Sequence, residues 1–414
     1  MPDHFKYYVG VDWAAERHQV CVLNDGRDLI AERVVEHTGP GLAEFVAWLI
    51  QLTHHAPDSV AVSIEIPRGA VVEILLEHGF QVFAINPKQL DRFRDRHTVA
   101  GAKDDRRDAF VLADSLRTDL PLFKPLQIDD PVIIHLRELS RLDDNLRLDH
   151  NQILNRFRDQ IARYFPQLLQ LSAAIDEPWI WELFELAPLP AQAAKLSAQR
   201  IEKVLRRARI RRLSAEDVRT ALQSQGFSLA PGAAEASAEH ALLLLPRLRL
   251  VHEQRAEVAR RIDAILQQLA APDGETRKHR DVTLLLSFPG IGRVIAATML
   301  AEASQPLRER DYHALRAYGG TAPITKQSGK KRYVVMRQAC SDRLRHAFYH
   351  WARVNAQLDP RSKEHYQQLR RAGHSHGRAL RGLADRLLAV LVAILNTGVP
   401  YNANLRKSLQ ASAA

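Results

Sequence analysis

Two acidic residues follow short apolar segments near the start of the chain. Asp12 ends the run VGVD at residues 9–12, and Glu65 directly follows VAVSI at residues 60–64. Apolar, β-branched runs of this length are typical of buried strands, so both carboxylates are expected at strand ends beside an apolar sheet. Burial there disfavours a charged carboxylate unless a cation compensates it. The pair therefore predicts a cation site.

A third acidic element opens a helix-like segment, KDDRRDAFVLA, at residues 103–113. Residues three or four apart share a helix face, so Asp105 and Asp108 lie together, and Asp104 with Asp108 would serve the same geometry. Converging carboxylates repel one another, and hard divalent cations relieve that repulsion, which favours Mg²⁺ or Mn²⁺ over zinc. Such a site activates a nucleophile or stabilises the leaving oxygen in phosphodiester chemistry. The alternative is that the strand-end carboxylates are turn residues and the aspartates only cap a helix.

A serine stands in a polar, glycine-containing segment at residues 319–331 that we predict to be a loop. Ser328 is flanked there by four basic residues, Lys326, Lys330, Lys331 and Arg332. This serine could attack a phosphodiester and form a phosphoserine link while the cations hold the phosphate. The covalent link conserves the bond energy, so the strands could be rejoined without ATP. The alternative, which residue spacing alone favours, is a basic loop that only contacts the DNA backbone.

The composition agrees with a folded protein that has a polyanionic partner. A formal charge of +10 and a pI of about 9.7 favour nucleic acid, because Lys and Arg release counterions condensed on phosphates. Cys21 and Cys340 have no CxxC partner, so we expect neither a disulfide framework nor a cysteine zinc site. No signal-peptide pattern and no long uncharged apolar run occur, so we expect a cytoplasmic protein without a membrane anchor.

The first 120 residues should form an α/β domain that positions the carboxylates. Strands are predicted at residues 7–13, 18–24, 29–36, 59–64 and 81–85, and helices at residues 42–52 and 71–78. The sequence Asn24-Asp25-Gly26 is a hairpin signal between the second and third strands. Three antiparallel strands followed by alternating helices and strands is the layout of ribonuclease-H-like nucleases and integrases.

From Pro131 onward, helical periodicity replaces the strand signals. Two apolar stripes predict long helices that pair with each other or with a second subunit: Leu139, Leu142, Leu146, Ile153, Phe157, Ile161 and Tyr164, and Leu244, Leu248, Val251, Val258, Ile262, Ile265 and Leu269. The stripes weaken at Asp149 and Arg255. Shorter helices are expected between them, with Ser197 and Ser214 as N-caps. Residues 230–237 are expected to be a flexible connector.

These patterns divide the chain into four parts. We expect a metal-binding α/β domain at residues 1–125, a helical, coiled-coil-like region at residues 126–280, and a mainly helical C-terminal domain at residues 281–402. Residues 403–414 are expected to be a flexible tail.

The acidic positions resemble those of the insertion-sequence 110 family of transposases. Asp12, Glu65 and the segment around Asp105 and Asp108 are similar to the Asp, Glu and Lys-(Thr/Ser)-Asp-x-x-Asp-Ala pattern of its RuvC-like domain. This chain has Asp104 where Thr or Ser is usual, and the register of the family pattern favours Asp105 as the ligand.

The C-terminal part resembles the second domain of the same family. The sequence FPGIG at residues 288–292 is similar to its helix-hairpin-helix turn, in which Gly290 and Gly292 would let backbone amides approach a DNA phosphate. The segment at residues 318–330 resembles Pro-x-x-x-x-Ser-Gly, whose serine is the family's nucleophile and is Ser328 here. The Lys-x-Gly-Asn common before the Leu-Arg pair is replaced by QACS at residues 338–341.

The resemblance implies a transposase that cuts and rejoins double-stranded DNA. It also implies a homo-oligomer, a dimer or tetramer, in which the metal domain of one subunit meets the serine domain of another. A structured noncoding RNA that pairs with donor and target DNA is a further implied partner. Two rival hypotheses are a RuvC-type junction-resolving nuclease that uses water, with Ser328 idle, and a non-catalytic DNA-binding scaffold.

Overall fold

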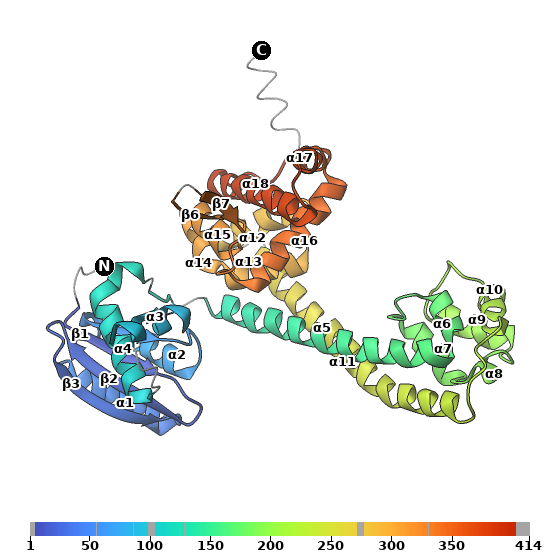
Figure 1. Cartoon of the computed structure of the whole chain (residues 1–414), viewed down its shortest axis with the longest axis horizontal. Coiled ribbons are helices and arrows are strands. Elements are labelled where there is room, and N and C mark those ends of the chain that lie inside the picture. The colour runs from blue at the N-terminus through green and yellow to red at the C-terminus, as the bar shows by residue number, and fades with distance from the viewer. Residues whose placement is uncertain are drawn as a thin grey trace, which may run out of the picture. The chain divides into compact units, whose positions relative to one another are not determined.

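The computed structural model divides into two compact units, Met1–Asp129 and Asp130–Ala414 (Figure 1). It describes residues 5–54, 56–85, 87–97, 104–123, 125–127, 130–270, 277–329 and 331–402. Lys330 and the predicted tail at residues 403–414 lie outside the described residues. We refer to the two parts below as the N-terminal unit and the helical unit.

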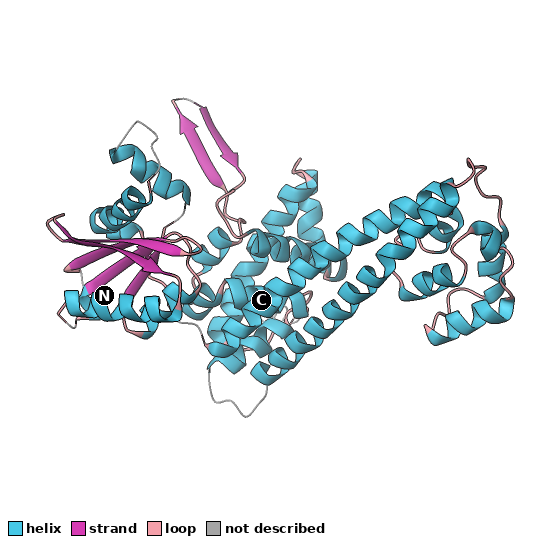
Figure 2. Ribbon diagram, turned by 90° about the horizontal axis from the view of Figure 1, so that it is seen from below, coloured by secondary structure: helices cyan, strands magenta, loops and turns pink. Residues whose placement is uncertain are grey.

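The N-terminal unit contains one five-stranded sheet in the order β3-β2-β1-β4-β5 (Figure 2). β1 pairs antiparallel with β2 and parallel with β4, β2 pairs antiparallel with β3, and β4 pairs parallel with β5. The strands are β1 (Tyr7–Asp12), β2 (Arg17–Asn24), β3 (Leu29–Glu36), β4 (Val60–Ile64) and β5 (Gln81–Ala84). The predicted strands are thus confirmed to within one residue at each end, because their apolar runs are bounded by turn-forming residues.

Helices pack on both faces of this sheet. On one face, Val9 and Val11 of β1 pack with α1 and α2. On the other face, Tyr8 packs with α4 and with Leu90 of α3. Side chains alternate between the two faces of a strand, and this unit buries both, which explains why β1 and β4 are mainly apolar. The helices are α1 (Gly39–Leu52), α2 (Ala70–Glu77), α3 (Pro87–His97) and α4 (Asp105–Asp119), with short η1 (Pro57–Ser59) and η2 (Leu120–Leu122).

The helical unit is organised around two long helices, α5 (Pro131–Tyr164) and α11 (Ala233–Ala270), which pack against each other. The apolar stripes predicted from the sequence therefore meet within one chain, so the stripes themselves do not require a second subunit. Leu142 departs from its stripe and is 42% exposed. Ser140 faces the interior instead, where its hydroxyl accepts a hydrogen bond from Arg343.

Two apolar cores share this helix pair. One core combines the second half of α5 and the first half of α11 with Trp181 and the short helices between them. Ser197 and Ser214 cap two of these helices, as predicted. The short helices are α6 (Pro166–Leu171), α7 (Pro178–Leu186), α8 (Pro190–Ala193), α9 (Ala198–Arg207) and α10 (Ala215–Gln223). The prediction of a flexible connector at residues 230–237 was wrong in its second half, because α11 already begins at Ala233, directly after Gly232.

The other core combines the remaining halves of the long helices with the C-terminal helices. These are α12 (Arg277–Ser287), α13 (Arg293–Glu302), α14 (Ser304–Glu309), α15 (Tyr312–Tyr318), α16 (Asp342–Leu358), α17 (Pro360–Arg371) and α18 (His376–Thr397). The segment predicted to be a loop is instead largely a hairpin of β6 (Ile324–Ser328) and β7 (Lys331–Val335). Its strands are short and polar and therefore lack the apolar alternation by which a strand is recognised. Among the described helices, none is long and apolar enough to cross a membrane.

Candidate functional site

Asp12 and Glu65 lie at corresponding positions on adjacent parallel strands. Val11 of β1 pairs with Ile64 of β4, so Asp12 and Glu65 are the next residues at the same edge of the sheet. Both carboxylates belong to the face that carries Tyr8, because alternate residues of a strand share a face. The structure thus confirms the predicted positions at two neighbouring strand ends.

A glycine lets α4 approach this edge closely. A Cβ atom on Gly10 would lie 1.9 Å from the carbonyl oxygen of Ala109 and 2.6 Å from the backbone nitrogen of Ala113. Gly10 shares its sheet face with Asp12, and Ala109 directly follows Asp108. Backbone-to-backbone packing of β1 on α4 therefore holds the first turn of α4 on the same face of the sheet as Asp12.

Asp108 is buried and is paired with an arginine that the sequence did not single out. Its side chain is 1% exposed and accepts two hydrogen bonds from Arg94 of α3, at 2.6 Å from Nε and 2.7 Å from Nη2. Arg94 also donates from Nη1 to Asp91 at 2.5 Å. Burial lowers the pKa of Arg94, but the bond to Asp108 and the charges of Asp108, Asp91 and Glu65 outweigh it and raise that pKa. Arg94 is therefore a cation that pairs with Asp108 at this acidic edge.

The two neighbouring aspartates at the start of α4 have different surroundings. Asp104 is the N-cap residue, and its carboxylate accepts a hydrogen bond from the backbone of Arg106 at 3.3 Å. Asp105 is the first residue of the helix and is exposed. The carboxylate of Asp104 therefore has a role in capping the helix. Asp105 is three residues before Asp108 and lies on the same helix face.

The four predicted carboxylates share one region but do not converge to metal-ligand spacing. Among the described residues, the one group whose possible ligand atoms all lie within 4.8 Å of one another is elsewhere, in the helical unit. The chemistry of the set still fits a hard divalent cation, since it offers only oxygen donors. The four carboxylates together also carry more negative charge than the single guanidinium of Arg94 can neutralise, which is a second reason for that fit.

The hairpin places Ser328 beside two of the predicted basic residues. Ser328 pairs with Lys331 across the strands, and Lys326 pairs with Tyr333. These four residues share one face of the hairpin, and all are exposed. Arg332 pairs with Gln327 and belongs to the opposite face. The exposed Tyr333 was missed by sequence reasoning, because only the strand register places it beside Lys326.

The two glycines of the predicted helix-hairpin-helix turn differ in their surroundings. A Cβ on Gly290 would lie 2.8 Å from the side-chain nitrogen of Asn355, and Gly290 has a φ of 78°. Trp351 and Asn355 of α16 both donate hydrogen bonds to the carbonyl oxygen of Pro289. Gly292 caps α13 and has open space around it. The turn is therefore anchored by α16 and exposes the N-terminus of α13.

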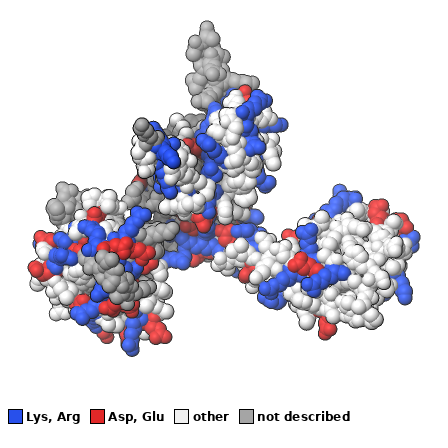
Figure 3. All heavy atoms as spheres, viewed as in Figure 1, with Lys and Arg blue, Asp and Glu red and all other residues white. Residues whose placement is uncertain are grey.

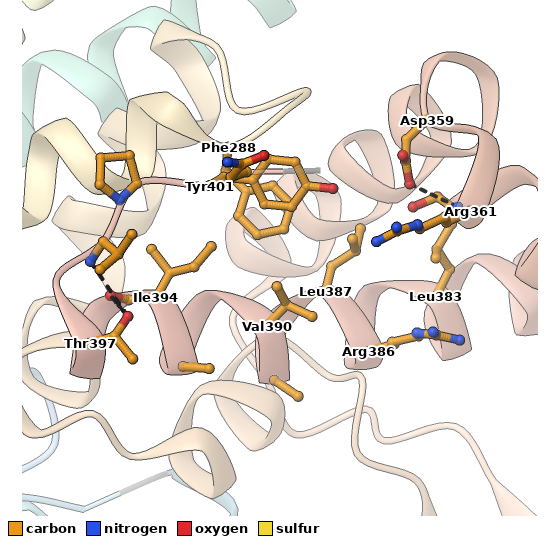
Figure 4. Close-up of a pocket in the computed structure, with 16 residues that line it drawn as sticks. Phe288, Asp359, Arg361, Leu383, Arg386, Leu387, Val390, Ile394, Thr397 and Tyr401 are labelled. Atoms are coloured by element: carbon orange, nitrogen blue, oxygen red, sulfur yellow. Dashed lines mark hydrogen bonds between the residues drawn. The ribbon is translucent and has the colours of Figure 1, made fainter. Parts of the chain in front are cut away.

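A pocket of about 570 Å³ lies in the C-terminal core (Figure 4). Phe288 and Tyr401 close one side of it, and Arg361 and Arg386 lie at one end. Its described lining includes none of the site residues predicted above. On the face of the molecule seen in Figure 3, Lys and Arg side chains gather over the β6/β7 hairpin. Basic side chains thus surround Ser328, and two further arginines, Arg361 and Arg386, lie at one end of this pocket.

Comparison with known proteins identifies relatives of both parts of the chain. A family model for transposases of the DEDD insertion-sequence 110 type matches residues 9–166, and the model for the IS116/IS110/IS902 transposase family matches residues 282–367. These two matches cover the segments that contain the predicted carboxylates and Ser328.

Individual relatives agree with these models. A protein of Streptomyces coelicolor, described as the mini-circle transposase for IS117, is 31% identical over 403 residues, which are 95% of each chain. A protein of Sinorhizobium fredii described as a transposase, y4uE, is 50% identical over 217 residues, 52% of this chain and 60% of that protein. The insertion element IS900 protein of Mycobacterium paratuberculosis is 25% identical over 402 residues, 95% of this chain and 97% of that protein. The chain therefore belongs to the IS116/IS110/IS902 family of DNA transposases.

Proposed function

We propose that this transposase cuts and rejoins double-stranded DNA with Ser328 as the nucleophile and the acidic edge of the N-terminal unit as a metal site. The observation that carries the proposal is the register of the hairpin. It sets an exposed serine directly opposite Lys331, with Lys326 and Tyr333 on the same face. Two cations beside a hydroxyl are suited to hold a phosphodiester against it.

In the proposed step, Ser328 Oγ attacks a backbone phosphorus atom of DNA. The Oγ–P bond forms, and the bond from phosphorus to one deoxyribose oxygen breaks. The serine proton passes to a base, and the leaving oxygen takes up a proton and becomes a hydroxyl group. Attack by a hydroxyl of another strand reverses the step, releases Ser328 and joins the new strands without ATP. Lys326 and Lys331 hold the phosphate throughout.

The metal site would be formed by Asp12, Glu65, Asp105 and Asp108. A bound Mg²⁺ or Mn²⁺ ion would stabilise charge on the attacking or leaving oxygen. Asp12 and Glu65 offer their carboxylates from the strand ends, and α4 offers the others from its first turn. The match to a DEDD transposase family supports divalent-metal use, and the all-oxygen donor set supports Mg²⁺ or Mn²⁺ over zinc.

DNA contacts are proposed at the basic hairpin and at the turn before α13. Lys326, Lys330, Lys331 and Arg332 would bind backbone phosphates. Gly292 would let the exposed N-terminus of α13 approach a phosphate, and Gly290 would shape the turn. The positive charge of the chain also supports a second polyanion, a structured noncoding guide RNA. A homo-oligomer would bring the metal site of one chain to the serine of another.

Trapping the covalent intermediate tests this proposal. The full-length protein would be incubated with its own element-end DNA and Mg²⁺, denatured, and digested, and the DNA-linked peptide would be mapped by mass spectrometry. We expect the link at Ser328. Ser328→Ala should lose both the adduct and strand exchange, while DNA affinity stays within about twofold, because only an exposed hydroxyl is removed.

Thr325→Ala is the matched control, since Thr325 is an exposed hydroxyl residue on the opposite face of the same hairpin. It should cleave normally. If Ser328→Ala cuts DNA at the normal rate in Mg²⁺, the carboxylates act through water and the junction-resolving nuclease becomes the correct description. If neither the wild type nor any variant cleaves DNA, with or without Mg²⁺, a non-catalytic DNA-binding role replaces both.

A further inference from the structure

The helix pair of the helical unit is interrupted by a polar layer between its two cores. On α5, Leu146 belongs to the C-terminal core and Ile153 to the other. On α11, Val258 belongs to the C-terminal core and Leu248 to the other. The residues between these positions include a histidine from each helix, His150 from α5 and His252 from α11. The break in both apolar stripes thus coincides with a pair of imidazoles.

His150 is buried without the hydrogen bonds that a buried imidazole needs. It is 1% exposed, and neither ring nitrogen has a hydrogen-bond partner among the described residues. Its Nε2 atom lies 3.2 Å from Oδ1 of Asp176, in the segment between α6 and α7. A buried polar group without a partner calls for a physical explanation, and a bound ion is one such explanation. The nearby carboxylate indicates a cation.

Three ligand atoms converge at this point from three separate segments. One possible ligand atom each from His150, Asp176 and His252 lie within 4.8 Å of one another. The centroids of the two imidazole rings are 6.0 Å apart. Two imidazoles and one carboxylate suit zinc and similar transition metals, whereas Mg²⁺ prefers oxygen ligands alone. The donor set therefore differs in kind from the acidic edge of the N-terminal unit.

The surroundings of His150 favour the neutral imidazole, which is the form that binds metal. Burial lowers the pKa of His150, and the charges of Arg255 and His252 add to this against the opposite effect of Asp176. Arg255 itself lies 3.9 Å from Asp143. His252 also lines a surface hollow of about 610 Å³ together with Trp181, which offers an ion a path from solvent.

We propose that His150, His252 and Asp176 bind one Zn²⁺ ion, with water as the fourth ligand, at the boundary between the two cores of the helical unit. The ion would join α5, α11 and the segment before α7, and so hold the helix pair together where apolar contacts are missing. This site is separate from the proposed catalytic metal site and independent of whether Ser328 is the nucleophile.

Cobalt binding to the full-length, chelator-treated protein tests the proposal. Co²⁺ in a tetrahedral site with imidazole ligands absorbs strongly in the visible range, whereas Co²⁺ in an octahedral, all-oxygen site absorbs weakly. We expect one strongly absorbing Co²⁺ per chain, displaced by an equimolar amount of Zn²⁺. Asp176→Asn and His252→Gln should each weaken binding by at least about tenfold, because each removes one of three ligands.

Matched controls separate this site from others. Asp149→Asn and His240→Gln change exposed residues of the same two helices and should bind as the wild type does. Asp12→Asn alters the acidic edge, and His37→Gln alters the other close imidazole pair, in which His37 lies 2.8 Å from His18. Both should retain the visible band. An absent band in the wild type, or an unchanged affinity in Asp176→Asn, would overturn the proposal and leave a buried imidazole beside Asp176 without a metal ion.

Thermal unfolding supplies a second measurement. Zn²⁺ should raise the melting temperature of the wild type, because a ligand that binds only the folded state stabilises it. Asp176→Asn should show no such rise, and its melting temperature without metal should stay close to that of the wild type, since Asp176 is exposed. An equal Zn²⁺ effect in both proteins would contradict the assignment.

Discussion

The two units of this transposase have opposite charge. Residues 1–129 contain 14 Lys and Arg against 20 Asp and Glu, a net charge of −6, whereas residues 130–414 contain 44 against 28, a net charge of +16. The overall charge of +10 conceals this division. An acidic unit suits a divalent cation, and a basic unit suits a polyanion. Catalytic metal and nucleic-acid backbone are therefore expected to be bound mainly by different parts of the chain.

The candidate residues of the two units also differ in burial. Asp108 is buried and bonded to Arg94, and it follows a helix start that packs directly on β1. Ser328 is exposed on a two-stranded hairpin. Substitutions at the acidic edge consequently risk the fold as well as the chemistry, whereas those on the hairpin should affect chemistry and DNA binding alone.

The largest expected effect comes from removing a strand-end carboxylate. Asp12→Asn keeps the size of the side chain, so the protein should fold normally while Mg²⁺-dependent strand exchange falls to background. A recombination assay with a melting curve measures both. Asp58→Asn, at an exposed acid of the same unit, is the control. Full activity in Asp12→Asn would show that this carboxylate is not needed for catalysis. It would also contradict the proposal that the acidic unit binds the catalytic metal while the basic unit binds DNA.

A smaller effect is expected where the sheet and α4 meet. In Gly10→Ala the new methyl group must displace the backbone of α4, which should lower the free energy of unfolding by about 1–3 kcal/mol. Urea unfolding followed by tryptophan fluorescence, to which Trp13 and Trp48 of this unit contribute, measures the change. Gly39→Ala has open space around its Cβ and should change stability little. An unchanged stability in Gly10→Ala would contradict the close packing of β1 on α4.

DNA affinity should report on the basic unit. Lys326→Ala and Lys331→Ala should each weaken binding several-fold and reduce the salt slope by about 0.9, because each removes one phosphate contact. Titrations at several salt concentrations measure both quantities. Lys6→Ala, in the acidic unit, is the control and should leave the slope unchanged. An equal loss of DNA affinity in Lys6→Ala would show that DNA binding depends on the total charge of the protein and not on the lysines of the hairpin.

The smallest effect is a pH dependence confined to the N-terminal unit. Burial and the charge of His37 lower the pKa of His18 from 6.5 to about 4. His18 therefore takes up a proton more readily in the unfolded chain than in the folded one. The free energy of unfolding should keep its full value above pH 6.5 and decline as the pH falls toward 4. His18→Gln cannot titrate and should flatten this decline. Melting temperatures at pH 7 and pH 5 test it, and an equal decline in both proteins would exclude His18 as the cause.

Local patterns in the sequence were sufficient for the sheet of the N-terminal unit, for the two long helices and for the position of the acidic residues. Alternating and continuous apolar runs located the five strands, and Ser197 and Ser214 marked two helix starts. These signals are local, since strand and helix periods and N-caps depend on residues close in sequence. For the same reason the short polar hairpin around Ser328 was predicted only as a loop.

Contacts between distant residues were decided by the tertiary structure alone. The pairing of Arg94 with Asp108, the close packing that requires glycine at position 10, and the meeting of His150, Asp176 and His252 each join separate elements. Nothing in the local sequence distinguishes Arg94 from Arg92 or Arg96, or His150 from an ordinary core histidine. The sequence by itself determined most of the elements that form and the family that the chain resembles. Only packing between those elements determined which charged side chains compensate one another, because burial makes an unpaired charge costly wherever it lies in the sequence.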